Sequence, residues 1–268
     1  MEILILLSVG LVAGGIGGLL GIGGSVIMIP AMVVLLGWDF HLAQAIAMTV
    51  NPAVALTATI KHQRNKNISW ESTKYVLPLA LICICIAAWL SNTIPSGWLE
   101  LSFGIFLVWV LWDQISCITG RTATIIHDSK PTPIKGAITG GVTGTTAGLL
   151  GIGGGLILVP LLNRLCSLNI KHAIGTSSSI MLITAICGAT VKDLSLPLAT
   201  NEAGELMGWQ AIDAITRSVW LLPGAIVGGW FGAVLTNTLP IKYIRIVFAI
   251  LVLLASCKMI YSGGISIF

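Results

Sequence analysis

Residues 14–30 read GGIGGLLGIGGSVIMIP, and residues 144–160 read GTTAGLLGIGGGLILVP. Ten of these 17 positions are identical at a constant offset of 130 residues. Farther along the chain, Pro78 matches Pro223 and Asn92 matches Asn237, at an offset of 145. Self-similarity at a fixed distance is typical of a duplicated unit. The sequence therefore predicts a first repeat over residues 1–119, a cytoplasmic linker over 120–134 and a second repeat over 135–268.

The composition is too apolar for a water-soluble protein. Apolar residues make up 56% of the chain and charged residues only 9%, whereas a soluble domain has about 25% charged residues. So few charged side chains cannot cover the surface of a 268-residue soluble protein. The composition predicts a polytopic integral membrane protein that has the lipid bilayer as its surroundings.

The lengths of the apolar runs predict how the chain crosses the bilayer. A hydrocarbon core about 30 Å thick needs about 20 helical residues for each crossing. Runs of that order lie at 3–20, 43–60, 74–94, 98–119, 135–150, 173–191, 215–237 and 241–261. Two shorter runs, 25–36 and 155–168, follow the glycine-rich breaks. We predict an all-α fold of eight to ten transmembrane segments, in which each repeat is a glycine-tipped hairpin followed by three crossings; the depth of the hairpin tips stays open.

The orientation of the two repeats follows from parity. A hairpin begins and ends on the same side, so three further crossings place the start of the second repeat on the opposite side. The repeats are therefore predicted to have inverted topology. With residues 61–73 in the cytoplasm, 11 of the 14 basic residues lie on that side, and Lys192, Arg217 and Lys258 lie outside. This predicts a multi-pass protein of the inner cell membrane with both termini extracytoplasmic.

The glycine motifs suggest a binding site. A helix broken inside a membrane must have its freed backbone groups satisfied by protein, water or substrate, and glycine allows the chain to turn sharply. Helices that restart near Ser25 and Gly155 would present unpaired N–H groups and a positive dipole end to an anion. The candidate substrate-binding residues in these turns are Gly21, Gly23, Gly24, Ser25, Gly151, Gly153, Gly154 and Gly155. The alternative is that spacings such as Gly14-xxx-Gly18 only allow helices to pack closely.

Polar side chains inside two other apolar runs are further candidates. Thr49 and Asn51 interrupt the run 43–60, and residues 49–51 align at an offset of 128 with Ser177–Ser179. The candidate donors to a solute are Thr49, Asn51, Thr176, Ser177, Ser178 and Ser179. Hydrogen bonding between helices is an equally open interpretation of these groups.

The sequence offers no clear carrier for a coupling ion. His41 and His172 lie at segment starts, which favours an interfacial position over a proton-coupling role. Asp113 lies toward the cytoplasmic end of its run, where a snorkelling or Arg-paired carboxylate is expected. Other carboxylates gather in the polar loop 192–213. Neither a buried carboxylate chain for protons nor a cage for Na⁺ is recognisable.

Several other classes of function lack their motifs. The chain has no GxSxG, HExxH or phosphate-loop sequence, so we expect it not to be an enzyme. None of the six cysteines forms a CxxC pair, and we expect no metal and no cofactor. The basic residues are scattered singly, which argues against nucleic acid as a partner.

The duplicated GLLGIGG(S/G)xxxxP motif and the two-half organisation resemble the TauE/SafE sulfite exporter family, also called the toluene sulfonate uptake permease group. The resemblance covers nearly the whole chain. It implies a permease of a prokaryotic inner membrane that moves small sulfur-containing anions such as sulfite, sulfonates, sulfoacetate or thiosulfate. It also implies that the two glycine turns and the polar patches at 49–51 and 176–179 form the substrate path. Ser25 stands where the second motif has Gly155, which leaves the two half-sites unequal.

We therefore expect a transporter that binds a small anion at the two turns and works by alternating access. Two alternatives stay open: an anion channel, and a non-transporting membrane scaffold or assembly subunit in which the glycines only pack helices. A homodimer is a candidate assembly. The sequence does not indicate the direction of transport or the coupling ion.

Overall fold

The computed structural model describes residues 2–119, 132–201, 203–235 and 241–267. Within these residues the chain is almost entirely helical, without a strand, and carries one isolated bridge between Thr200 and Leu206. The helices are α1 (Glu2–Leu20), α2 (Ser25–Leu36), α3 (Phe40–Arg64), α4 (Trp70–Ser91), α5 (Ser96–Ile118), α6 (Pro133–Leu150), α7 (Gly155–Arg164), α8 (Ile170–Ser195), the short 3₁₀ turn η1 (Leu196–Leu198), α9 (Ala211–Leu235) and α10 (Ile241–Ile267). The all-α membrane fold is confirmed. Most of the predicted linker at 120–134 lies outside the described residues.

The described helices include seven that are long and apolar enough to cross a bilayer: α1, α3, α4, α5, α8, α9 and α10. α2 and α7 are shorter apolar helices, and they follow the two glycine breaks. α6 has 18 residues, but five of them are glycine and seven are threonine, alanine or lysine, which lowers its hydropathy. Each half thus carries a hairpin that begins with a longer helix and ends with a shorter one, as the run lengths predicted.

Glycine makes both hairpin turns. Gly21 and Gly23 in the first turn have φ of 67° and 80°, and Gly151 and Gly153 in the second have φ of 70° and 68°. Residues with a Cβ rarely adopt this left-handed region. The turns differ at their fourth position, where Gly24 has φ of −89° and Gly154 has φ of 83°. The repeat in sequence therefore produces two similar but unequal turns.

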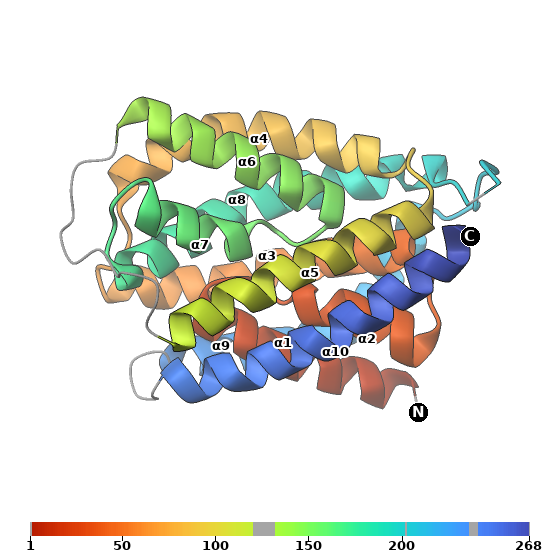
Figure 1. Ribbon diagram of the computed structural model, residues 1–268, viewed down its shortest axis with the longest axis horizontal. Coiled ribbons are helices and arrows are strands. Elements are labelled where there is room, and N and C mark those ends of the chain that lie inside the picture. The colour runs from red at the N-terminus through yellow and green to blue at the C-terminus, as the bar shows by residue number, and fades with distance from the viewer. Residues whose placement is uncertain (1, 120–131, 202, 236–240, 268) are drawn as a thin grey trace.

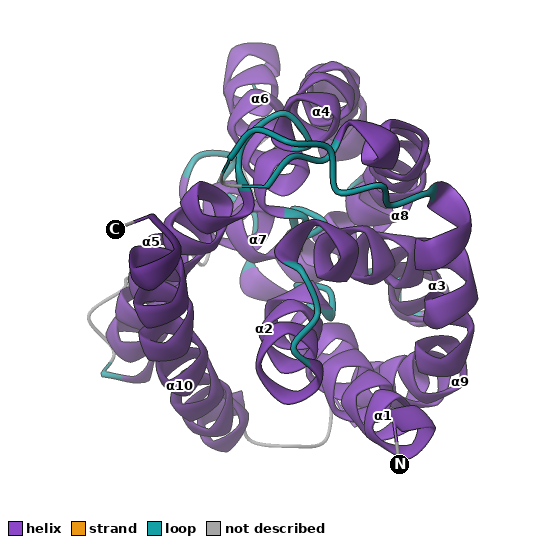
Figure 2. Cartoon of the chain, turned by 90° about the vertical axis from the view of Figure 1, so that its right-hand side faces the viewer, coloured by secondary structure: helices purple, strands orange, loops and turns teal. Residues whose placement is uncertain are grey.

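Each packed helix pair of one half has a counterpart when every helix is replaced by its equivalent in the other half. α1 packs along α9, and in the same way α6 packs along α4; α3 packs against α8, and α5 against α10. Viewed end-on, the pairs α1–α9, α4–α6 and α5–α10 lie around the outside, with α2 and α7 between them (Figure 2). α3 and α8 are the most buried of the candidate spans. The chain begins and ends at the same end of the molecule (Figure 1).

Close packing of the α1–α9 pair depends on glycine at every fourth residue. A Cβ on Gly14 would lie 2.8 Å from the Cα of Ala225, and one on Gly18 would lie 3.0 Å from the Cα of Gly229. The same holds in reverse for glycines of α9 that face α1, namely Gly224, Gly228 and Gly232. The two interpretations of the glycines thus apply to different positions: the regular spacing allows helix contact, and the GIGG segments form the turns.

We predict that Gly14→Ala destabilises the protein by about 1 to 3 kcal/mol, because the added methyl group overpacks the α1–α9 contact. Gly15→Ala is the matched control on the neighbouring residue, since its Cβ would meet only the Gly228 carbonyl oxygen at 3.8 Å. Thermal unfolding in detergent measures both variants. Equal midpoints for the two would contradict the packing role.

Candidate functional site

The two glycine turns touch each other near the middle of the helix bundle. A Cβ on Gly155 would lie 2.7 Å from the Gly21 carbonyl oxygen and 2.8 Å from the Ile22 Cα. Ser177 of α8 binds both turns, because its hydroxyl donates to the Gly21 carbonyl at 3.1 Å and lies 3.4 Å from the Gly155 carbonyl. The structure therefore brings together the two turns, which lie 130 residues apart in the sequence.

Asn51 of α3 also reaches both turns. Its Oδ1 accepts a hydrogen bond from the Gly24 amide at 3.3 Å, and its Nδ2 donates to the Ser25 hydroxyl at 2.5 Å. On the other side, the same Nδ2 lies 2.7 Å from the position that a Cβ of Gly153 would take. Asn51 has no exposed surface. One amide side chain thus fixes the entry to α2 and lies against the second turn.

The contacts correct the predicted alignment of the polar patches. Gly23 and Gly153 both approach Asn51 and the Met181 sulfur, and residues 51 and 181 are 130 apart, as are the two turns. Asn51 is therefore related to Met181 and not to Ser179. The offset of 128 was wrong because no residues are gained or lost between each turn and the long helix that packs against it. The first repeat supplies the amide and the second supplies the hydroxyl.

Each turn leaves backbone N–H groups free at the start of the following helix. In α2 the first described bonds are from the amides of Ile27 and Met28 to the Gly24 carbonyl, and in α7 the first is from Leu158 to Gly154. Neither helix has a side-chain cap. Among the described residues, the amides of Ser25, Val26, Gly155, Leu156 and Ile157 thus have no acceptor. These are the donors, at positive helix ends, that an anion site needs.

The other predicted donors are occupied elsewhere. Thr176 accepts a hydrogen bond from the Ser69 amide at 2.9 Å, and so holds the start of α4. Ser178 and Ser179 donate within α8, to the carbonyls of Ile174 and Thr176. Thr49 donates to Asp193 at 2.8 Å. Of the six polar side chains, Asn51 and Ser177 are the two that contact the turns.

The place where the two glycine turns meet, which we call the crossing of the turns, is closed to the surroundings in this conformation. Every candidate residue of the site is buried except Thr49, which is half-buried. Gln44, which the sequence analysis did not single out, adds to the seal: its Nε2 donates to the Leu149 carbonyl at 2.7 Å, and its side chain lies against Gly151. Gln44 lies 130 residues before Ile174, which lies against Gly21, so the two residues take equivalent places at the two turns. Access to the site requires the helices to move.

Two polar side chains at helix ends are buried. Lys192 was placed in an outside loop, but α8 continues to Ser195 and the Lys192 side chain is completely buried. This prediction was wrong because the charge ended the apolar run in the sequence, although the helix and its packing go on. His41 lies at the start of α3, the segment start expected from the sequence, and its side chain has no exposed surface. The pairing of Asp113 is as expected, since Arg164 Nη2 donates to its Oδ1 at 2.7 Å.

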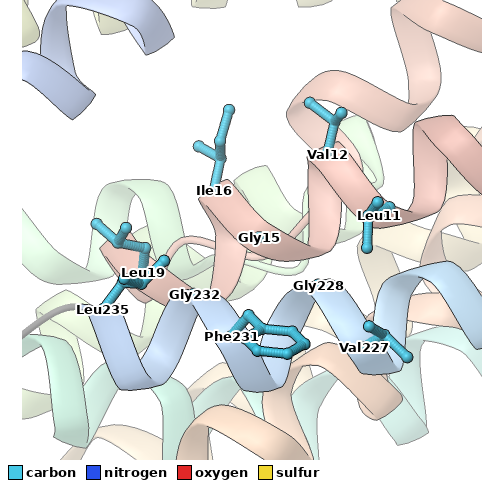
Figure 3. Close-up of a pocket in the computed structure, with 10 residues that line it drawn as sticks. All are labelled: Leu11, Val12, Gly15, Ile16, Leu19, Val227, Gly228, Phe231, Gly232 and Leu235. Carbon is cyan, nitrogen blue, oxygen red and sulfur yellow. The ribbon is translucent and has the colours of Figure 1, made fainter.

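An open groove lies away from the turns, between α1 and α9. Its volume is about 570 Å³, and glycine and large apolar side chains line it (Figure 3). Leu11, Val12, Val227 and Phe231 of this lining are exposed to the surroundings. Without a polar group the groove suits an acyl chain and not an anion. Elsewhere in the described residues, no three His, Cys, Asp or Glu side chains converge on a metal-sized site.

Comparison with known proteins places this geometry in a family. The family described as "Sulfite exporter TauE/SafE" matches residues 6–259. The chain belongs to the TauE/SafE family. The resemblance noted in the glycine motifs is thus confirmed. No solved structure matches the chain.

Several relatives in the family carry names of the same kind. A "Probable membrane transporter protein YunE" of Bacillus subtilis is 25% identical over 98% of this chain and 99% of its own length. A "Probable membrane transporter protein" of Haemophilus influenzae is 26% identical over 96% of this chain and 97% of its own. The "Probable membrane transporter protein MamO" of Paramagnetospirillum magneticum is 23% identical over 97% of this chain. The chain spans 45% of the length of that MamO protein.

We predict that Gly153→Ala lowers the thermal unfolding midpoint more than Gly204→Ala. Both glycines have positive φ, of 68° and 76°, so both substitutions carry the backbone strain of about 1 kcal/mol. A Cβ at 153 also meets the Asn51 amide nitrogen at 2.7 Å, whereas one at 204 meets nothing within 4 Å. The difference between the two variants therefore isolates the turn-to-Asn51 contact, and its absence would contradict that contact.

Proposed function

We propose that this TauE/SafE protein is a permease that moves a small anion, most favourably a sulfur-containing one such as sulfite, a sulfonate or thiosulfate, by alternating access. The observation that supports it most is the set of free amides at the starts of α2 and α7, two helix ends whose turns are in contact. Such amides bind negative oxygens without a cationic side chain. The family description supports the sulfur-anion class.

The proposed mechanism uses two repeats of inverted topology, residues 1–119 and 135–268. The exchange of helix pairs between the halves supports it, as do the starting points of α1 and α6, which lie at opposite ends of the molecule in Figure 1. In such a transporter, one half rocks against the other around a site near the bilayer midplane. The proposal keeps the expected setting, an inner cell membrane with both termini extracytoplasmic. A homodimer is not required, because one chain supplies both turns.

Opening the site means breaking the bonds that join the turns. Ser177 ties the turns together, and Asn51 ties α3 to the start of α2. An anion that accepts hydrogen bonds from the free amides, and from Ser177 or Asn51, replaces these contacts while the halves move. The sealed crossing favours a carrier over an open anion channel, and the transporter family argues against a scaffold that moves nothing.

The test is transport of ³⁵S-labelled sulfite, thiosulfate and sulfoacetate by proteoliposomes. The wild type is expected to exchange at least one of them, with saturation and counterflow. Ser177→Ala should lower exchange about tenfold, the effect of one buried hydrogen bond of about 1.4 kcal/mol. Ser218→Ala is the matched control, since it is equally buried and its hydroxyl donates to Ile215 in its own helix. Movement of cations or neutral solutes, but of none of these anions, would show that the proposed substrate class is wrong.

Cysteine accessibility separates a carrier from a sealed scaffold. Ser25→Cys should react with a membrane-impermeant thiol reagent from one side at a time, and saturating anion should slow the reaction, because the site opens alternately. The same label at Ala203, which is exposed in the loop before α9, provides the control for reagent delivery. Protection of Cys at position 25 from both sides under all conditions would contradict alternating access.

A further inference from the structure

A second polar cluster lies at the end of the bundle where α3 begins and α4 and α8 end, and the proposed anion path does not use it. Its centre is Lys192 near the end of α8, which is completely buried. Asp193 follows it, and Asp39 and His41 lie at the start of α3, where the positive charge of Lys192 opposes the rise in the pKa of the Asp39 carboxyl that burial causes. We call Asp39, His41, Lys192 and Asp193 the ionic cluster.

The hydrogen bonds of the ionic cluster are incomplete. The Lys192 ammonium has three N–H donors, but within the described residues it donates only to the Ser91 hydroxyl, at 2.9 Å. Two buried acceptors nearby are in a similar position: in the part of the chain that the structure describes, Asp193 Oδ1 has no partner, nor has Oδ1 of the neighbouring Asn92. His41 has no exposed surface, and neither of its ring nitrogens makes a hydrogen bond that meets the distance and angle criteria within the described residues. A buried polar group without a partner is costly, so binding of a proton at Asp193 Oδ1 removes part of this cost.

The charges of the cluster indicate which ligand fits. With Lys192 protonated, both carboxylates ionised and His41 neutral, the cluster carries one net negative charge. No described carboxylate pairs directly with the ammonium, and a net charge is unfavourable in a buried site. One added proton makes the cluster neutral. At Asp39, which caps α3, burial raises the pKa of the carboxyl although the His41 and Leu42 amides lower it.

One bond connects the cluster to the turns. Thr49 of α3 donates to Asp193 Oδ2 at 2.8 Å, and two residues farther along α3 Asn51 binds the first glycine turn. A hydrogen bond to an ionised carboxylate is about twice as strong as one to a neutral group. Protonation at the free Oδ1 of Asp193 therefore weakens the link between α8 and α3.

We propose that the ionic cluster binds one proton, held at Asp193 and shared with Lys192 and His41, and that this proton is coupled to movement of the anion. Proton binding loosens the Thr49–Asp193 link and lets α3 move relative to α8 with Asn51 and the first turn. Proton release restores it. The inference rests on the proposed anion transport, and it adds the coupling ion that the sequence did not indicate.

The coupling test compares exchange with gradient-driven accumulation of ³⁵S-thiosulfate in proteoliposomes. In the wild type, an imposed pH gradient should drive thiosulfate above its equilibrium distribution. Asp193→Asn keeps the Thr49 bond but removes the proton site, so it should retain exchange within about threefold and lose the gradient-driven accumulation. Asp213→Asn is the matched control, because Asp213 is a partly exposed carboxylate paired with Arg217. Accumulation driven by a sodium gradient and unaffected by pH would overturn the proposal.

A second measurement does not depend on transport. Potentiometric titration of the full-length protein in detergent, between about pH 5 and pH 9, should count about one proton fewer in Asp193→Asn than in Asp213→Asn, relative to the wild type. This separates the two proposals: if no anion moves but the count differs, the proton site stands and the anion function fails. An equal count in both variants would overturn the proton site, whether or not exchange survives.

Discussion

The structure depends on one constraint: backbone that turns inside a membrane protein must have its polar groups satisfied locally. Here the two glycine turns lie together, and side chains of α3 and α8 bond their backbone groups. They lie in direct contact, Asn51 bonds the entry to one of them, and Ser177 bonds the carbonyls of both. What stays unsatisfied is a small set of amides at the starts of α2 and α7. The same constraint that shapes the fold therefore leaves donors for a ligand.

The packing around this crossing uses glycine for a second purpose. Along α1 and α9, and along α6 and α4, glycines at four-residue spacing bring helix backbones together. In the turns, Gly21, Gly23, Gly151, Gly153 and Gly154 have positive φ, and the spacing glycines do not. Glycine thus serves both to break a helix at the turns and to let helices pack closely. The two uses differ in the backbone conformation of the glycine.

Much of this could be predicted from the sequence. Apolar run lengths located the helices because a bilayer fixes how long a crossing must be, and the duplicated GLLGIGG located both turns. Asn51 and Ser177 could be chosen as polar groups at depth, but their partners could not, because contacts between α3, α8 and the turns are set by packing. Lys192 was misplaced for a related reason: a charged residue marks a loop in most sequences, and here it lies in α8 and is completely buried. The ionic cluster therefore became visible only in three dimensions.

The central claim is that free amides at the crossing bind an anion, and amide chemical shifts test it most directly. In protein labelled with ¹⁵N at glycine and serine, titration with thiosulfate should shift the Ser25 and Gly155 amides together, with one saturable affinity. The Gly204 amide, far from the helix starts in the loop before α9, should not move. Saturable shifts that spare Ser25 and Gly155, or no shift at all at concentrations that support exchange, would contradict the account.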